Sequence, residues 1–160
     1  MRQNIVIIGM PGVGKTTIAR EIGRLYHIPV IDIDEEIVKT HGDIPAIFAE
    51  RGEAGFRAIE KEKVHIAAKA WGVVIATGGG SVLDPENVEA LREGGKVYWL
   101  RRPLEELSSD GRPLSAGGLQ AVEKLWQERK HIYDASKDVI VHNVRIRDAA
   151  EEIVRDFREE

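Results

Sequence analysis

Short apolar runs alternate with longer stretches of mixed polarity along the whole chain. The runs are rich in β-branched residues, as is typical of strands that are buried on both faces. Five such strands are predicted, over residues 5–8, 29–34, 72–77, 96–100 and 138–142. Helices are predicted between and after them, over residues 15–26, 35–40, 53–70, 84–94, 119–136 and 148–159. This alternation predicts an α/β fold of three layers, in which helices cover both faces of a parallel sheet.

Capping residues and glycines predict where several of these helices begin and end. Asp43 and Pro45 are typical of a helix start, and Gly52 predicts a break before residues 53–70. Residues 108–118 have the sequence SSDGRPLSAGG. Such a concentration of Gly, Ser and Pro disfavours regular structure, so we expect a mobile loop there.

Composition narrows the class of protein. The 160 residues fit one domain, residues 1–160, with its own core. A net charge of −4 disfavours nucleic-acid binding, which requires a basic surface, and the lack of cysteine excludes thiolate metal sites. The apolar runs are far shorter than the ~20 residues of a membrane span, and the first lacks the features of a signal peptide. We therefore expect a cytoplasmic protein that binds neither nucleic acid nor membranes.

The richest chemical signal is the sequence NIVIIGMPGVGKTT at residues 4–17, in which a strand leads through a glycine loop into a helix. It matches the phosphate-binding loop of nucleotide-binding proteins, the P-loop. Gly9, Gly12 and Gly14 allow positive φ, so that N–H groups turn inward beside a helix N-terminus. Lys15 would then reach the β- and γ-phosphates. The alternative is a glycine-rich turn with a lysine there by chance.

Two carboxylates, Asp32 and Asp34, close the second predicted strand. Ligands of open α/β sheets bind at the carboxyl ends of the strands. Two residues apart on a strand, the carboxylates would point to the same side, which suits a kinase that binds Mg²⁺ and an acceptor hydroxyl. The alternative is a solvated strand end or a cap for the following helix.

A glycine triplet, residues 78–80, follows the third predicted strand and predicts close approach of a ligand, with a flexible turn as the alternative. Three arginines are candidates for binding an anion, although single arginines are more often solvated. Arg57 and Arg129 lie in predicted helices, and Arg112 lies in the predicted mobile loop. In that loop Arg112 could neutralise transition-state charge.

The aromatic and imidazole side chains give no signal of their own. Trp71, Trp99 and Trp126 are interpreted as core or boundary residues. The five histidines have no metal-ligand spacing and are interpreted as structural or surface residues.

Taken in order, the motifs resemble the shikimate kinase family over residues 5 to about 142. They are GMPGVGKTT, DID, GEAGFRAIE, ATGGGSV, GRPL and ERKHIYDAS. The resemblance implies the fold of nucleoside monophosphate kinases, with a five-stranded parallel sheet in the order 2-3-1-4-5 and a short lid over residues 108–118. It also implies ATP-dependent phosphorylation of the 3-hydroxyl of shikimate, on the pathway to chorismate, by a monomer.

The resemblance also implies roles on the nucleotide side. Lys15 would hold the phosphates and assist catalysis, Thr16 would bind Mg²⁺, Asp32 would contact the metal through water, and Arg112 would close on ATP. The residues that would hold the phosphates are Gly12, Val13, Gly14, Lys15, Thr16 and Thr17.

On the acceptor side, the resemblance implies a substrate-binding segment over residues 33–61. Asp34 would hydrogen-bond the reacting hydroxyl as the base. Arg57 and Arg129 would bind the shikimate carboxylate, because a guanidinium binds a carboxylate bidentately. Gly79 and Gly80 would pack against the ring.

The chain departs from the family before the lid, where Leu107 is followed at once by SSDG. Family members carry there a longer helix with an arginine that stacks on adenine. Arg145 or Arg147, after the fifth predicted strand, are the candidates to replace that arginine.

Three alternative functions remain to be weighed. A gluconate-type kinase should lack the combination of Arg57, the glycine triplet and Arg129. A regulatory GTPase requires an Asn-Lys-x-Asp motif, which is absent from this sequence. A non-catalytic nucleotide-binding module would have no need of Lys15 and Asp34, both of which are present.

Overall fold

The computed structural model describes residues 2–107 and 118–159 and contains one five-stranded sheet. The strand order is β2-β3-β1-β4-β5, and all neighbouring strands are parallel. This confirms the expected order. The strands are β1 (Asn4–Ile8), β2 (Val30–Asp32), β3 (Val74–Ala76), β4 (Gly95–Arg101) and β5 (Val139–His142).

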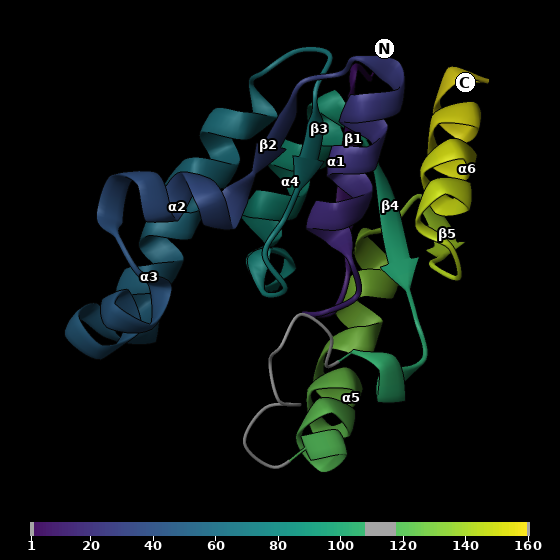
Figure 1. Ribbon diagram of the computed structural model, residues 1–160. Helices are drawn as coiled ribbons and strands as arrows, with labels where there is room; N and C mark the ends of the chain where they lie inside the picture. Colours follow the sequence, from purple (N-terminus) through teal and green to yellow (C-terminus); the bar gives the residue numbers. More distant parts are fainter. Residues whose placement is uncertain (1, 108–117, 160) are drawn as a thin grey trace.

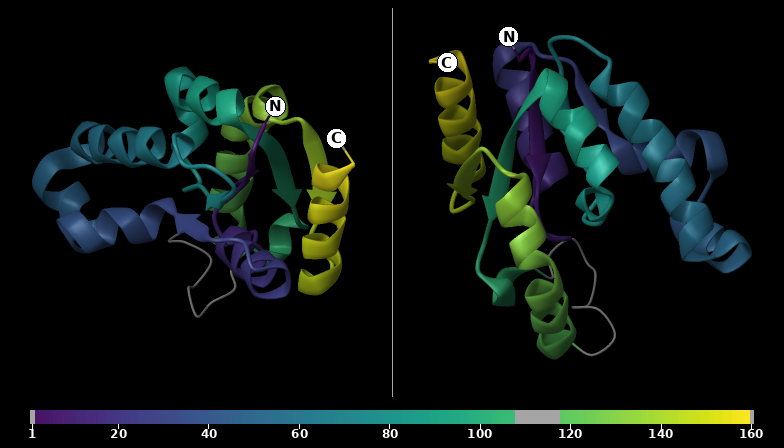
Figure 2. Two further views of the ribbon diagram at one scale, coloured as in Figure 1. Left: turned by 90° about the horizontal axis from the view of Figure 1, so that it is seen from above. Right: turned by 180° about the vertical axis from the view of Figure 1, so that it is seen from behind.

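Helices cover both faces of the sheet, which confirms the three-layer α/β architecture. They are α1 (Lys15–Tyr26), α2 (Ile33–His41), α3 (Ile44–Ala68), α4 (Pro85–Gly94), α5 (Gly118–Ser136) and α6 (Ile146–Arg158). Two short 3₁₀ helices are η1 (Ser81–Leu83) and η2 (Leu104–Glu106). Helices α1 and α6 lie side by side on one face, with α4 and α5 on the other, while α2 and α3 pair beyond the β2 edge (Figures 1 and 2).

The central strand shows why the apolar runs form this sheet. All five residues of β1 are buried, because β3 and β4 flank it and helices cover both of its faces. Its register places Ile5 beside Val74 of β3 and Lys96 of β4. Removal of these apolar side chains from water is the main stabilising contribution to the layer.

Capping hydrogen bonds form at the starts of two helices, one of them at the predicted cap Asp43. The Asp43 carboxylate accepts a hydrogen bond from the Ala46 N–H at 3.3 Å at the start of α3. The Asp84 carboxylate accepts one from the Glu86 N–H at 2.9 Å at the start of α4. Gly52, at φ 72°, breaks the helical geometry inside α3, as its position predicts.

Two expectations are wrong. Strand β2 ends at Asp32, so Asp34 lies in the first turn of α2 and the two carboxylates do not share one side of a strand. The helix begins this early because Asp32 caps it and the apolar side chains of Ile33 and Ile37 are fully buried. Trp71, expected in the core or at its boundary, is 78% exposed in the turn between α3 and β3.

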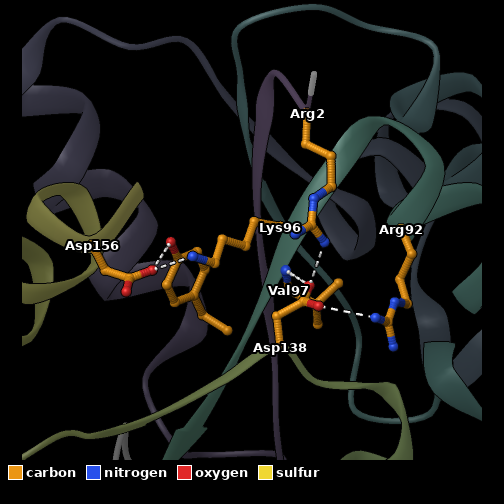
Figure 3. Close-up of polar contacts among 7 residues, drawn as sticks. Arg2, Arg92, Lys96, Val97, Asp138 and Asp156 are labelled. Carbon is orange, nitrogen blue, oxygen red and sulfur yellow. Dashed lines mark hydrogen bonds and ion pairs between the residues drawn. The ribbon is translucent and has the colours of Figure 1, made fainter. Parts of the chain in front are cut away.

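At the amino ends of the strands, one carboxylate ties four segments together. Asp138 accepts hydrogen bonds from Arg2 at 3.0 Å, from Arg92 of α4 at 2.9 Å and from the Val97 N–H of β4 at 2.8 Å (Figure 3). Asp138 therefore fixes the start of β5 against the neighbouring strand and the N-terminal segment.

A second carboxylate, Asp156 of α6, binds β4 from the face of the sheet that α1 and α6 cover. It forms an ion pair with Lys96 at 2.8 Å and accepts a hydrogen bond from the Tyr98 hydroxyl at 2.6 Å (Figure 3). Burial alone would raise the pKa of Asp156, but these two hydrogen bonds and the Lys96 charge outweigh it, so the pKa is lowered.

The structure bears in part on two further expectations, the lid and the lack of a membrane span. Most of the predicted lid, residues 108–117 with Arg112, lies outside the described residues, and Gly118 is the first residue of α5. Among the described residues, no helix combines the length and apolar character that a membrane crossing requires.

Candidate active site

The predicted phosphate-binding loop joins the carboxyl end of β1 to the N-terminus of α1 (Figure 1). Gly9, Gly12 and Gly14 all have positive φ, at 152°, 81° and 103°, which confirms the expected backbone. Space also requires glycine, since a Cβ at Gly9 would lie 2.6 Å from the Leu100 carbonyl oxygen and one at Gly12 only 2.1 Å from that of Leu107. The loop therefore curls at the N-terminus of α1, whose cap residue Gly14 has no side chain to cap it, and such a glycine loop at a helix start is an anion-binding arrangement.

Lys15 lies folded over this loop. Its side chain is only 8% exposed, and Nζ donates to the carbonyl oxygens of Gly9 at 2.7 Å and Met10 at 3.0 Å. The ammonium group is thus held at the loop by its own backbone. A phosphate at the same place would offer a stronger, charged acceptor.

Thr16 and Asp32 meet across the gap between α1 and β2. The Thr16 hydroxyl donates to Oδ2 of Asp32, while Oδ1 of Asp32 accepts from the Glu35 N–H at 3.0 Å. Asp32 therefore caps α2, which confirms the alternative interpretation, and its other carboxylate oxygen contacts Thr16 beside the P-loop.

This pair fits Mg²⁺, because that ion prefers oxygen ligands and takes one or two carboxylates together with substrate phosphates. Residues 2–107 and 118–159 hold no cluster of three or more His, Cys, Asp or Glu side chains suited to a metal.

The glycine triplet passes between side chains that the sequence predicts to bind the acceptor. A Cβ at Gly78 would lie 2.9 Å from Oδ1 of Asp34, and one at Gly80 would lie 2.4 Å from Nη1 of Arg57. Both glycines have backbone torsions that other residues adopt. Glycine is therefore needed here for space, because functional groups crowd the backbone.

Gly79 joins the triplet to the P-loop. A Cβ there would lie 2.7 Å from Cγ of Pro11 and 3.3 Å from Nη1 of Arg129. The structure thus brings Arg129, on α5, to the same segment as Asp34 and Arg57, although the three residues are far apart in sequence.

Glu60 is a site residue to which the sequence alone assigns no role. The residue is only 1% exposed, and its carboxylate accepts hydrogen bonds from Nη1 of Arg57 at 2.9 Å and from the Ser81 hydroxyl at 3.1 Å. The Ser81 oxygen in turn accepts from the Gly78 N–H at 3.0 Å. A buried carboxylate needs such partners, so Glu60 fixes both Arg57 and the triplet. The sequence signal that could have found this pair is the three-residue spacing of Arg57 and Glu60, which places both side chains on the same face of a helix.

Tyr133 is a second such residue. It is fully buried on α5, and its hydroxyl donates to the Gly79 carbonyl oxygen at 2.7 Å. Burial raises the pKa of Tyr133, an effect that the nearby Arg129 and Arg57 guanidinium groups partly offset. The hydroxyl therefore stays protonated and available as a donor.

A cavity of about 500 Å³ opens on the other side of the P-loop. Gly14 and Thr17 line it from the P-loop side, together with Arg102 and Arg145 from the segments after β4 and β5. Of the two arginines proposed to contact adenine, Arg145 borders this cavity, while Arg147 forms an ion pair with Glu151 at 3.7 Å.

Comparison with known proteins identifies the family. The family model described as shikimate kinase matches residues 11–159. The chain belongs to the shikimate kinase family. The family assignment makes it an enzyme of the kinase class, with the P-loop kinase fold that the strand order indicates.

Individual shikimate kinases agree with this assignment. The chain is 40% identical to the one from Thiobacillus denitrificans over 152 residues, which cover 90% of this chain and 83% of that protein. It is 36% identical to the one from Dictyoglomus turgidum, with both chains covered completely. The solved shikimate kinase from Acinetobacter baumannii in complex with shikimate superposes with a TM-score of 0.91 at 29% identity, covering 99% of this chain and 94% of that one.

Proposed function

We propose that the protein transfers the γ-phosphoryl group of ATP to the 3-hydroxyl of shikimate, giving shikimate 3-phosphate and ADP. The observation that carries this proposal is the arrangement around residues 78–80, where Asp34, Arg57 and Arg129 converge directly beside the P-loop. Two arginines and one carboxylate are the groups needed to bind a small hydroxy acid and to accept a hydroxyl proton.

On the donor side, the loop amides and Lys15 bind the β- and γ-phosphates of ATP. Residues 12–17 supply these contacts at the N-terminus of α1, where the helix dipole favours negative charge. Thr16 and Asp32 would hold Mg²⁺, with Asp32 contacting it through water. The metal would neutralise charge that develops on the phosphates.

On the acceptor side, Arg57 and Arg129 bind the shikimate carboxylate, and in that orientation a hydroxyl of shikimate points toward Asp34. Asp34 accepts the hydroxyl hydrogen bond as the general base. Glu60 keeps the Arg57 guanidinium in one orientation through the 2.9 Å hydrogen bond. Gly79 and Gly80 pack their backbone against the ring. The space that side chains would take at these two positions is filled by Pro11, Arg129 and Arg57.

For the rest of the nucleotide, Arg145 is the proposed adenine contact, since it lines the cavity beside Gly14 and Thr17. The lid of residues 108–118, with Arg112 as a catalytic and ATP-binding group, stays a prediction. We further propose that the enzyme acts as a cytoplasmic monomer on small molecules, without nucleic-acid or membrane partners.

A coupled assay of ADP release with shikimate, quinate and gluconate as acceptors tests this function. Shikimate should support turnover well above the rate of ATP hydrolysis alone, and the other two should not. Lys15→Met should lower kcat by ~10²-fold or more, because the transferring phosphoryl group loses a charged contact. Preference for gluconate would support the alternative sugar-acid kinase, and no acceptor dependence would support a nucleotide-binding module.

A further inference from the structure

Tyr133 lies one helical turn after Arg129 on α5, at the contact between this helix and the glycine triplet. Its ring stacks on Trp99 of β4 at 5.9 Å between centroids, and Trp99 stacks on Trp126 at 5.8 Å. The stack fixes the ring, so the hydroxyl has one position, 2.7 Å from the Gly79 carbonyl oxygen.

Gly79 is confined from three directions. Tyr133 holds its carbonyl oxygen, and Pro11 of the P-loop and the Arg129 guanidinium fill the space that a Cβ on Gly79 would need. The positive charge of the Arg129 guanidinium also acts to lower the pKa of Tyr133. The phenolic oxygen therefore holds the Gly79 backbone directly beside the arginine that would bind the acceptor carboxylate.

We propose that Tyr133 is a positioning residue for the acceptor, and that its hydroxyl sets the separation between Gly79 and Arg129 at which the shikimate carboxylate and ring both fit. The inference rests on the proposed function. Tyr133 acts through Gly79 and Arg129 and need not touch the reacting atoms. The cavity proposed for the nucleotide borders Gly14 and Thr17 and none of the residues that contact Gly79, so loss of the hydroxyl should affect the acceptor much more than the nucleotide.

The test is Tyr133→Phe, which keeps the stacked ring and removes only the hydroxyl. The Gly79 carbonyl oxygen then loses this donor, so its position beside Arg129 is no longer fixed. The shikimate KM should rise roughly 5- to 20-fold, the effect of one lost buried hydrogen bond, with the ATP KM within about 2-fold. Equilibrium binding of shikimate without nucleotide should weaken by a similar factor.

Tyr98→Phe is the matched control. Tyr98 is also fully buried, and its hydroxyl also makes a short hydrogen bond, to Asp156 at 2.6 Å, but on the side of β4 that packs against α6. Both variants should lose stability, and only Tyr133→Phe should change the shikimate KM. Kinetics are measured at a temperature at which circular dichroism shows both variants to be folded.

Three outcomes are informative. A selective rise in the shikimate KM supports the proposal. An unchanged shikimate KM in Tyr133→Phe overturns it. Equal rises of the shikimate and ATP KM values in both Tyr133→Phe and Tyr98→Phe also overturn it, and leave Tyr133 a structural residue. Failure of the unsubstituted enzyme to phosphorylate shikimate would instead refute the proposed function, so the two failures are distinguishable.

Discussion

Replacement of Gly80 by alanine should damage shikimate binding without damaging the fold. Gly80 has φ −101°, which alanine adopts without strain. The added Cβ would lie 2.4, 2.6 and 2.7 Å from Nη1, Nη2 and Cζ of Arg57, distances that no real contact allows. The guanidinium must therefore move, although Glu60 holds it at 2.9 Å and it lies 5.3 Å from the Phe56 ring centroid.

The magnitude follows from what the displaced guanidinium loses. A hydrogen bond to a charged group contributes about 1.5–3 kcal/mol, and each 1.4 kcal/mol is tenfold in affinity. Gly80→Ala should thus raise the shikimate KM roughly 10- to 150-fold. The free energy of unfolding should fall by about 1–3 kcal/mol, because the buried Glu60 carboxylate loses its hydrogen bond from the displaced guanidinium, and the protein should stay folded.

Steady-state kinetics and urea denaturation measure the two effects. Gly94→Ala is the control, since it adds a methyl group to a glycine at the far end of the sheet, 3.3 Å from the Ala68 carbonyl oxygen. The double variant Gly80→Ala with Arg57→Ala should be little worse than Arg57→Ala alone, because both changes remove the same contact. Additive losses in this double variant, or a shikimate KM that alanine leaves unchanged, would refute the reasoning.

Three further substitutions test separate parts of the account. Asp34→Asn should lower kcat by ~10²- to 10⁴-fold, with ATP binding intact by calorimetry. Asp32→Asn keeps a capping side chain and should regain activity as the Mg²⁺ concentration is raised. Equal losses in both variants that do not respond to Mg²⁺ would contradict these separate roles. Asp138→Ala should lower the free energy of unfolding by about 1–3 kcal/mol in urea titrations and leave both KM values unchanged, since Asp138 bonds Arg2, Arg92 and Val97 far from the site. The pKa of Asp156 is lowered in the folded state, so its carboxylate stabilises the fold at pH values above its unfolded pKa. This stabilisation is lost as the pH falls through the folded pKa. The Tm difference between the native protein and Asp156→Asn should therefore be present at pH 7 and vanish in acid.

The strands and the P-loop were predictable because their signals are local. An apolar run such as residues 5–8 forms a central strand wherever helices cover both faces, and it does so here as β1. Gly9, Gly12 and Gly14 adopt positive φ as the motif requires, and Asp43 caps the helix that it precedes. The strand order came from family resemblance, because local patterns do not say which strands are neighbours.

The errors and omissions arise from tertiary contacts. The end of β2 was placed too late because the burial of Ile37 in α2 is not visible from the alternation of residues 29–34. Glu60 and Tyr133 acquire their roles from contacts with residues 78–81, which are distant in sequence. Trp71 is exposed because it lies in a turn, where its apolar character does not decide its position.

Identification of the product tests the central claim most directly. After incubation of the purified protein with Mg²⁺, ATP and shikimate, a proton–phosphorus NMR correlation shows which carbon of the product carries the phosphate. The account predicts one new phosphate ester, coupled to the proton on carbon 3, in amounts equal to the ADP formed. A phosphate coupled to the proton on carbon 4 or 5, or ADP formed with inorganic phosphate alone, would contradict it.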